Sequence, residues 1–184
     1  ANIPVVSTLM GIGAFPANHR LFMGMLGMHG RAYANKAVTE SDLVIAVGAR
    51  FGDRLTGDVS GFAPGAKIIH IDIDPAEIGK NINVHIPIVG DVKQVLAEMV
   101  KHVASRKPSE WNEKMTTLRK EDVLPEGETG LKPIDVIKEL SKKTSGNAII
   151  TTEVGCHQMW TAQYYEFTKP RTFISSGGLG TMGY

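Results

Sequence analysis

The sequence predicts an α/β fold with a doubly wound, mostly parallel sheet of the Rossmann-like type. Short apolar runs without polar alternation, such as residues 43–47 and 67–71, suit strands that are buried on both faces of a parallel sheet. Helix-compatible segments alternate with these runs, as the α/β class requires. Glycine accounts for 20 of the 184 residues and gathers in short clusters, which indicates close approach of the backbone to a ligand.

Four strands are expected in the first hundred residues. Besides the two runs above, residues 5–8 and 85–89 have strand character, and Pro87 confines the last of these to a sheet edge or a strand start. Residues 31–41 between them are compatible with a helix. The order of these segments therefore predicts strands joined by helical crossovers.

Two helix starts are predicted after the strand at 67–71. Asp91 is placed as the N-cap of an amphipathic helix whose apolar residues recur at helical spacing over 92–103. Asp74 has the pattern of a second cap, with Pro75 at the first helical position and Glu77 able to reach back to the cap.

The chain changes character after residue 106. Residues 107–130 are rich in charge, proline and glycine and are expected to form a linker that carries a polar helix over 109–121. A second unit over 131–184 begins with a helix that Pro133 opens and Ser145-Gly146 ends, followed by a strand at 148–152, a helix at 155–165 and a strand at 173–175. This unit is too small to bury a core by itself, so we expect the chain to be a segment of a longer protein.

Composition excludes several classes of function. A net charge of +1 argues against a nucleic-acid-binding surface. The single cysteine, Cys156, excludes an internal disulfide and an all-cysteine metal site. There is no apolar run long enough to span a membrane and no signal-peptide pattern at the start, so we expect a cytoplasmic protein without membrane contact.

Polar residues at two strand ends could contact a nucleotide. Asp72 ends a strand, where an acidic residue of a nucleotide-binding sheet accepts a ribose hydroxyl; the alternative is a solvated carboxylate. Arg50 and Arg54 follow the strand at 43–47 between glycines, and their guanidinium groups could bind a diphosphate; the alternative is a surface turn with ordinary ion pairs.

Two further segments could line a cofactor. Residues 24–30 mix glycine with methionine and leucine, which suits packing against a flat heteroaromatic ring; the alternative is a packed core loop. Cys156-His157 is a buried or ligand-lining pair rather than a catalytic one, because sequence adjacency does not create a thiolate–imidazole pair. The histidines are scattered without the spacing of a metal site.

Taken in order, the motifs at 8–11, 24–30, 50–57, 70–74, 154–160 and 176–183 resemble those of the catalytic large subunit of acetohydroxyacid synthase, also called acetolactate synthase. Members of this family use thiamine diphosphate, magnesium and FAD. They decarboxylate pyruvate and join the two-carbon unit to a second 2-keto acid in branched-chain amino-acid biosynthesis. The resemblance implies that residues 1–106 belong to the central FAD-binding domain and residues 131–184 to the start of the thiamine-diphosphate-binding domain.

The resemblance also implies two sets of cofactor-binding residues. Those expected along FAD are Thr8, Leu9, Met10, Leu26, Gly27, Met28, His29, Gly48, Arg50, Asp53, Arg54, Leu55, Asp72, Ile73 and Asp91. Those expected at thiamine diphosphate are Cys156, His157, Gly180 and Met182, with Gly180 and Met182 at the aminopyrimidine.

The chain departs from the family pattern at Cys156, where the family has glutamine. By the resemblance, the magnesium motif lies beyond Tyr184 and the catalytic glutamate lies in a preceding domain, so this segment carries no catalytic residue or metal ligand and is expected to be inactive alone. A homodimer or higher oligomer of the full subunit and a small regulatory subunit are the expected partners. Pyruvate oxidase, another flavin-containing thiamine enzyme and a free-standing nucleotide-binding module with a regulatory role are the alternatives.

Overall fold

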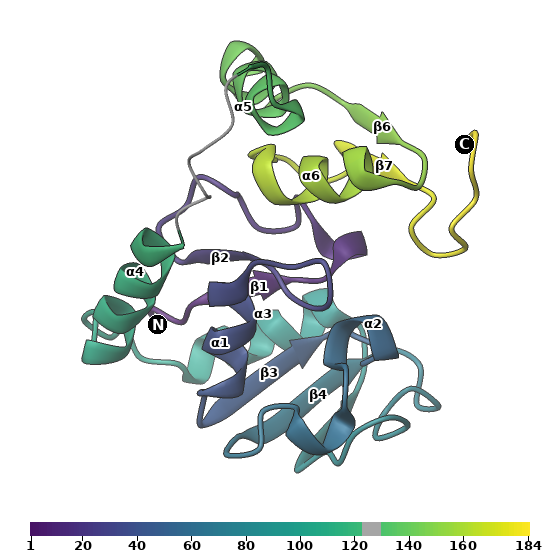
Figure 1. Ribbon diagram of the computed structural model, residues 1–184. Coiled ribbons are helices and arrows are strands. Elements are labelled where there is room, and N and C mark those ends of the chain that lie inside the picture. The colour runs from purple at the N-terminus through teal and green to yellow at the C-terminus, as the bar shows by residue number, and fades with distance from the viewer. Residues whose placement is uncertain (123–129) are drawn as a thin grey trace.

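The computed structural model describes residues 1–122 and 130–184 and confirms an α/β fold (Figure 1). Pro125 and Gly127, on which part of the linker prediction rests, lie outside the described residues. The strands are β1 (Val5–Ser7), β2 (Phe22–Met25), β3 (Leu43–Val47), β4 (Lys67–Asp72), β5 (Ile86–Val89), β6 (Ile150–Thr152) and β7 (Phe173–Ser175). The helices are α1 (Ala32–Thr39), α2 (Asp53–Thr56), α3 (Val92–His102), α4 (Glu110–Glu121), α5 (Pro133–Thr144) and α6 (Cys156–Tyr164), with 3-10 turns at Leu9–Gly11 and Val59–Gly61.

Every strand pair in the described chain is parallel. The strands form three small sheets, in the orders β1-β2, β3-β4-β5 and β6-β7. Leu43 pairs with Lys67 and Val47 with Ile71, so β3 and β4 are in register along their length. Strand β5 lies at the edge of its sheet, as Pro87 predicted.

The expectation that residues 43–47 are buried on both faces is wrong. Leu43 and Val47 are 46% and 40% exposed, because β3 forms one edge of its three-stranded sheet. The core beneath this sheet comes instead from Ala46, Ile68 and Phe51, which lies just after β3.

Helix starts agree with the sequence in two places and disagree in one. Asp91 caps α3 by accepting from the N–H of Gln94 at 3.0 Å, and Pro133 occupies the first turn of α5. The predicted helix after Asp74 does not form. Asp74 accepts from the N–H of Ala76 at 2.9 Å in a tight turn, and the carboxylate of Glu77 pairs with Lys80 at 3.0 Å instead of reaching back.

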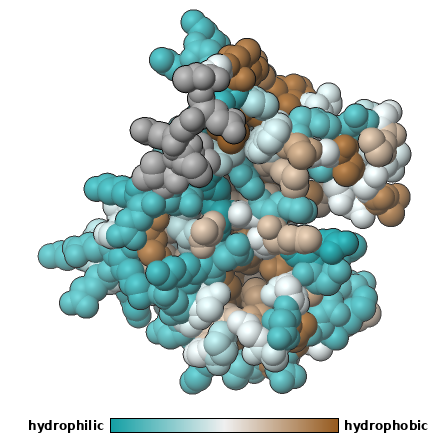
Figure 2. Space-filling model, viewed as in Figure 1, coloured by the Kyte–Doolittle hydropathy of each residue, from teal (hydrophilic) through white to brown (hydrophobic). Residues whose placement is uncertain are grey.

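Helix α4 packs against residues 1–106, which we call the first unit. Met115 is 2% exposed and lies in one core cluster with Met23 of β2 and Ala37 of α1. Lys114 pairs with Glu40 at 2.7 Å, and this bond holds the pKa of the Glu40 carboxyl below its ordinary value. In Figure 2 the surface over α4 is mainly hydrophilic, and hydrophobic residues come to the surface near α5 and the C-terminal segment, where Leu131 and Leu179 are exposed.

The two ends of the chain share a hydrophobic core. Ile12 and Met25 pack with Tyr165 and Phe167, whose ring centroids are 4.5 Å apart. The segment after β1 and the segment after α6 are therefore held against each other by buried side chains.

Candidate functional site

The candidate site lies where the parallel strands of the first unit end. The N–H of Leu26 donates to the carbonyl of Ser7 at 2.9 Å, which joins the ends of β1 and β2. At the end of the other sheet the N–H of Gly48 donates to the carbonyl of Ile71 at 2.8 Å. Ligands of parallel α/β sheets bind at this edge, beyond the carboxyl ends of the strands.

Backbone contacts bring together two of the predicted cofactor loops. The N–H of Met28 donates to the carbonyl of Arg54 at 2.8 Å. A Cβ on Gly27, whose φ is +105°, would lie only 2.6 Å from that same carbonyl, so only glycine allows this close approach. A cavity of about 240 Å³ opens beside the contact and is lined by Leu26, Gly27, Met28, Leu55 and their neighbours.

The loop that holds Met28 is fixed by a residue that the sequence analysis did not single out. Asn35 on α1 accepts from the N–H of Gly27 at 2.9 Å and donates to the Gly27 carbonyl at 3.0 Å. One side-chain amide thus satisfies both polar groups of a glycine backbone, as a neighbouring strand would. In the sequence Asn35 is one polar residue on a helix, and no local pattern predicts that it binds the backbone of Gly27.

The side chains predicted along the flavin are largely exposed at this edge. Met10, Met28 and Ile73 are 67%, 59% and 68% exposed. Thr8 caps the turn that contains Met10 by accepting from the N–H of Gly11 at 3.1 Å. Large apolar side chains that stand free at a ligand-binding edge can pack against a flat ring.

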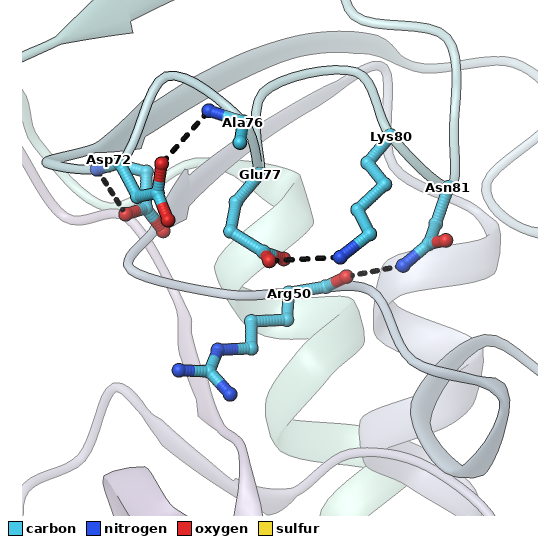
Figure 3. Close-up of polar contacts among 7 residues, drawn as sticks. Arg50, Asp72, Ala76, Glu77, Lys80 and Asn81 are labelled. Atoms are coloured by element: carbon cyan, nitrogen blue, oxygen red, sulfur yellow. Dashed lines mark hydrogen bonds and ion pairs between the residues drawn. The ribbon is translucent and has the colours of Figure 1, made fainter.

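Arg50 and Arg54 differ in what they contact. The guanidinium of Arg54 faces the adjacent Asp53 at 3.7 Å, and both side chains are mostly exposed, as the ion-pair alternative predicted for that residue. The guanidinium of Arg50 has no hydrogen bond or ion pair to any residue of the described ranges 1–122 and 130–184. Figure 3 shows it pointing away from the segment that carries Lys80 and Asn81.

Asp72 is buried and not solvated, so the alternative reading of it as a solvated carboxylate is wrong. Its side chain is 8% exposed, and Oδ1 accepts from the N–H of Asp74 at 3.0 Å. Its backbone carbonyl accepts from the N–H of Gly90 at 2.9 Å, which brings Asp91 to the same end of the sheet. The second carboxylate oxygen stays available to a hydroxyl donor.

The backbone after β3 borders open space. A Cβ built on Gly48, where φ is +61°, meets no atom within 4 Å, so the backbone there faces open space. An apolar edge, a free guanidinium and a buried carboxylate are the three kinds of group that a ring, a diphosphate and a ribose require.

The second candidate region surrounds the start of α6. Cys156 and His157 are both exposed on its first turn, so the interpretation of the pair as buried is wrong, and a ligand-lining role stays a prediction. Val154 comes within 4.0 Å of a Cβ built on Gly180, and the carboxylate of Glu153 accepts from the N–H of Gly183. The segment after β7 therefore lies beside the N-terminus of α6, which favours an anionic ligand.

A buried hydrogen-bond network supports this region from below. Gln158 donates to Oγ of Ser175 at 2.5 Å, and Thr152 donates to the same oxygen at 3.1 Å. The network ties α6 to β6 and β7 at the level of Cys156. Sequence reasoning missed it, because buried polar residues in strands and helices carry no local signature.

Two contacts join the candidate regions to each other. A Cβ on Gly177 would lie 2.5 Å from Cδ2 of Leu9, and Gln163 of α6 donates to the carbonyl of His29 at 2.5 Å. Leu9 and His29 belong to the predicted flavin loops, and Gly177 precedes the predicted pyrimidine-binding residues. The predicted flavin loops therefore lie against α6 and against the segment that leads to Gly180 and Met182.

A larger cleft lies elsewhere. It has a volume of about 1140 Å³ and lies between α1, α4, α5 and α6, away from the strand ends. Three of its cations are engaged: Arg31 pairs with Asp122 and lies 4.7 Å from the Tyr164 ring, Lys138 lies 5.5 Å from the same ring, and Arg119 donates to the carbonyl of Phe22. None of the predicted cofactor residues lines this cleft, so we place neither predicted cofactor in it.

Two kinds of feature do not occur in the parts of the chain that the structure describes. Within residues 1–122 and 130–184, no three histidine, cysteine, aspartate or glutamate side chains converge as metal ligands. Over the same ranges no helix has the length and apolar character needed to cross a membrane.

Comparison with known families gives two matches. Residues 1–99 match the central domain of thiamine pyrophosphate enzymes, and residues 153–184 match the C-terminal domain that binds thiamine pyrophosphate in these enzymes. The two matched regions contain the two candidate regions described above.

Curated relatives are similar over the whole chain. A protein of Corynebacterium glutamicum named acetolactate synthase large subunit is 52% identical over 192 aligned residues, which cover 99% of this chain and 30% of the relative. A probable acetolactate synthase large subunit of Methanococcus aeolicus is 48% identical over 202 aligned residues, covering 100% of this chain and 34% of the relative. The chloroplastic acetolactate synthase 1 of Nicotiana tabacum is 48% identical, over 99% of this chain and 28% of its own length. The chain therefore spans about a third of the length of these relatives.

Proposed function

Because the chain belongs to the thiamine pyrophosphate enzymes, we propose that it forms part of an acetolactate synthase large subunit. The observation that carries the proposal is an identity of 48–52% to relatives of that name over 99–100% of the chain. In the proposed protein, residues 1–106 contribute to an FAD-binding domain, residues 107–130 connect it, and residues 131–184 begin the thiamine-diphosphate-binding domain.

The first unit would hold FAD at the carboxyl ends of its strands. The apolar side chains of Met10, Met28 and Ile73 stand free for the rings. The unpaired guanidinium of Arg50 would bind the diphosphate, and the free oxygen of Asp72 would accept a ribose hydroxyl. Leu9 and His29 lie where the flavin loops meet the second unit.

The second unit would hold the diphosphate end of thiamine diphosphate. The first turn of α6 offers backbone N–H groups and the exposed side chains of Cys156 and His157 to the phosphate oxygens. Gly180 and Met182 would contact the aminopyrimidine, and Met182 is 73% exposed and free to do so. Thiamine diphosphate, when bound, supplies the electron sink for decarboxylating pyruvate and joining its two-carbon unit to a second 2-keto acid.

The proposed substrates are thus pyruvate and a second 2-keto acid. A homodimer or higher oligomer, a small regulatory subunit and a bound magnesium ion also belong to the proposal, with the metal ligands outside this segment. The tobacco relative is named as chloroplastic, so a cytoplasmic location for this chain stays a prediction.

The test is an assay of the full-length enzyme with pyruvate, thiamine diphosphate, magnesium and FAD. We expect acetolactate to form without oxygen consumption, and the 184-residue chain alone to form none. Turnover of pyruvate that consumes oxygen would favour a pyruvate oxidase. The absence of any pyruvate turnover, with thiamine diphosphate bound, would overturn the proposal.

A further inference from the structure

We propose that Asn81 is a positioning residue for Arg50, holding the backbone of that residue so that its guanidinium faces the cofactor diphosphate. Asn81 donates from Nδ2 to the carbonyl of Arg50 at 2.8 Å, across 31 positions of sequence (Figure 3). This inference rests on the proposed flavin site and adds to it a residue that does not touch the cofactor.

The backbone around Arg50 is unusual and is held on both sides. Gly48 has a φ of +61°, and Phe51 has a φ of +51°, a left-handed conformation that residues with a side chain seldom adopt. Arg50 thus lies in a segment with one positive φ value before it and another directly after it. Without outside support such a turn would sample other conformations.

Phe51 anchors the turn from the core side. Its side chain is 4% exposed, and its ring meets the edge of Phe62 at 5.7 Å and of His70 at 5.0 Å between centroids. Both ring nitrogens of His70 are buried without a hydrogen-bond partner in the described chain, so the imidazole serves this site as a packing surface. Apolar packing fixes Phe51 in place but leaves the peptide that precedes it free to rotate.

Asn81 supplies the missing constraint on that peptide. Its amide holds the Arg50 carbonyl on the side opposite to the guanidinium, as Figure 3 shows. Two contacts stabilise the segment from residue 72 to residue 81. The N–H of Asp74 donates to Oδ1 of Asp72 at 3.0 Å, and Nζ of Lys80 pairs with Oε1 of Glu77 at 3.0 Å. The same segment therefore begins at the predicted ribose acceptor and ends on the predicted diphosphate arginine.

The consequence is a lower ordering cost when the cofactor binds. A long side chain on a fixed backbone loses less freedom on binding than one on a mobile turn. The free energy of one neutral hydrogen bond corresponds to a roughly three- to tenfold decrease in binding affinity when that bond is lost. We expect a change of that size in FAD affinity when Asn81 can no longer donate.

The test measures FAD binding to the full-length enzyme by quenching of flavin fluorescence. Asn81→Asp preserves the shape of the side chain and removes the donor. Asn83→Asp, at an exposed asparagine two residues later, adds the same charge and is the matched control. We expect Asn81→Asp to weaken FAD by roughly three- to tenfold and Asn83→Asp to change it by less than about twofold.

A double variant decides whether the effect passes through Arg50. In an Arg50→Ala background Asn81→Asp should have no further effect on FAD affinity. An equal loss in that background, or equal affinities in the two aspartate variants, would overturn the inference. If Asn81→Asp does not fold, Asn81→Ala with an unchanged unfolding midpoint of the apoenzyme takes its place.

Failure of the flavin proposal gives a different result. If the wild-type enzyme does not bind FAD, or if Arg50→Ala binds it as well as wild type does, the flavin assignment itself is wrong and this inference falls with it. If Arg50→Ala weakens FAD and Asn81→Asp does not, only the inference about Asn81 fails.

Discussion

Asn35 and Gly27 form a reciprocal pair in which one side-chain amide satisfies both polar groups of one glycine. Oδ1 of Asn35 accepts at 2.9 Å and Nδ2 donates at 3.0 Å. The pair fixes the loop of Leu26, Gly27 and Met28 against the carbonyl of Arg54. Because Asn35 belongs to α1, this helix fixes the position of the backbone that carries the exposed side chain of Met28 at the candidate flavin site.

Replacing Asn35 by alanine should destabilise the first unit. Two partly buried backbone groups of Gly27 would lose their partner, at a cost of about 1–3 kcal/mol. Urea unfolding of the full-length apoenzyme measures the change. Asn18→Ala, at an exposed asparagine, is the control and should change stability by less than about 0.5 kcal/mol. Equal stability of the two variants would show that the Asn35 pair contributes nothing.

Arg50→Ala should weaken FAD strongly. Loss of a charge-assisted bond to a phosphate costs about 1.5–3 kcal/mol, which is roughly a ten- to hundredfold loss of affinity. Arg106→Ala is the control, because Arg106 lies near Asn2, before the amino end of β1, and should leave FAD binding unchanged. Flavin titration of the full-length variants, with folding confirmed by circular dichroism, measures both. The same FAD affinity in both would remove the Arg50 loop from the cofactor site.

Cys156→Gln should preserve or tighten the binding of thiamine diphosphate. Cys156 is exposed on the first turn of α6, and an amide N–H donates to a phosphate oxygen more strongly than a thiol does. Cys156→Ala should bind no more tightly than the cysteine enzyme. Calorimetric titration of the full-length apoenzyme with thiamine diphosphate and magnesium ranks the three residues. Identical affinities for all three would place position 156 outside the site.

Gly177→Ala should destabilise the contact between the two candidate regions. The new methyl group would lie 2.5 Å from Cδ2 of Leu9, and because the end of that side chain can shift, we expect a cost at the low end of overpacking, about 1 kcal/mol. Since the clash involves the end of a side chain, Leu9→Ala in the same protein should recover part of the loss. Thermal unfolding of the two single variants and the double variant measures this coupling. Strict additivity would show that the two residues do not touch.

Much of the fold could be predicted because its signals are local. The apolar run at 43–47 became β3 with the same bounds, Asp91 caps α3, and residues 173–175 became β7. Strand β2 was missed because it contains a glycine, and because its last two residues, Gly24 and Met25, were assigned to the ring-contacting segment at 24–30. The helix after Asp74 was predicted wrongly, since its capping pattern also fits the tight turn in which Asp74 accepts from the N–H of Ala76.

The candidate site was predicted less completely than the fold. Motif residues such as Arg50, Asp72 and Cys156 could be named from their order along the chain. The residues that hold them could not, because Asn35, Asn81 and Gln158 act on partners that are 8, 31 and 17 positions away. Such pairs depend on how the backbone returns on itself, and a sequence pattern does not contain that distance.

The parallel pairing of every described strand determines when the protein can fold during its own synthesis. Leu43 pairs with Lys67, so β3 has no partner until 24 further residues have been made. At about 5–20 residues per second, that delay lasts roughly one to five seconds on the ribosome. A β-hairpin forms within microseconds once its two strands have been made. Strand β3, in contrast, stays unpaired until the residues that connect it to β4 have been translated. A nascent chain of this kind is therefore expected to meet chaperones before its three-stranded sheet is complete.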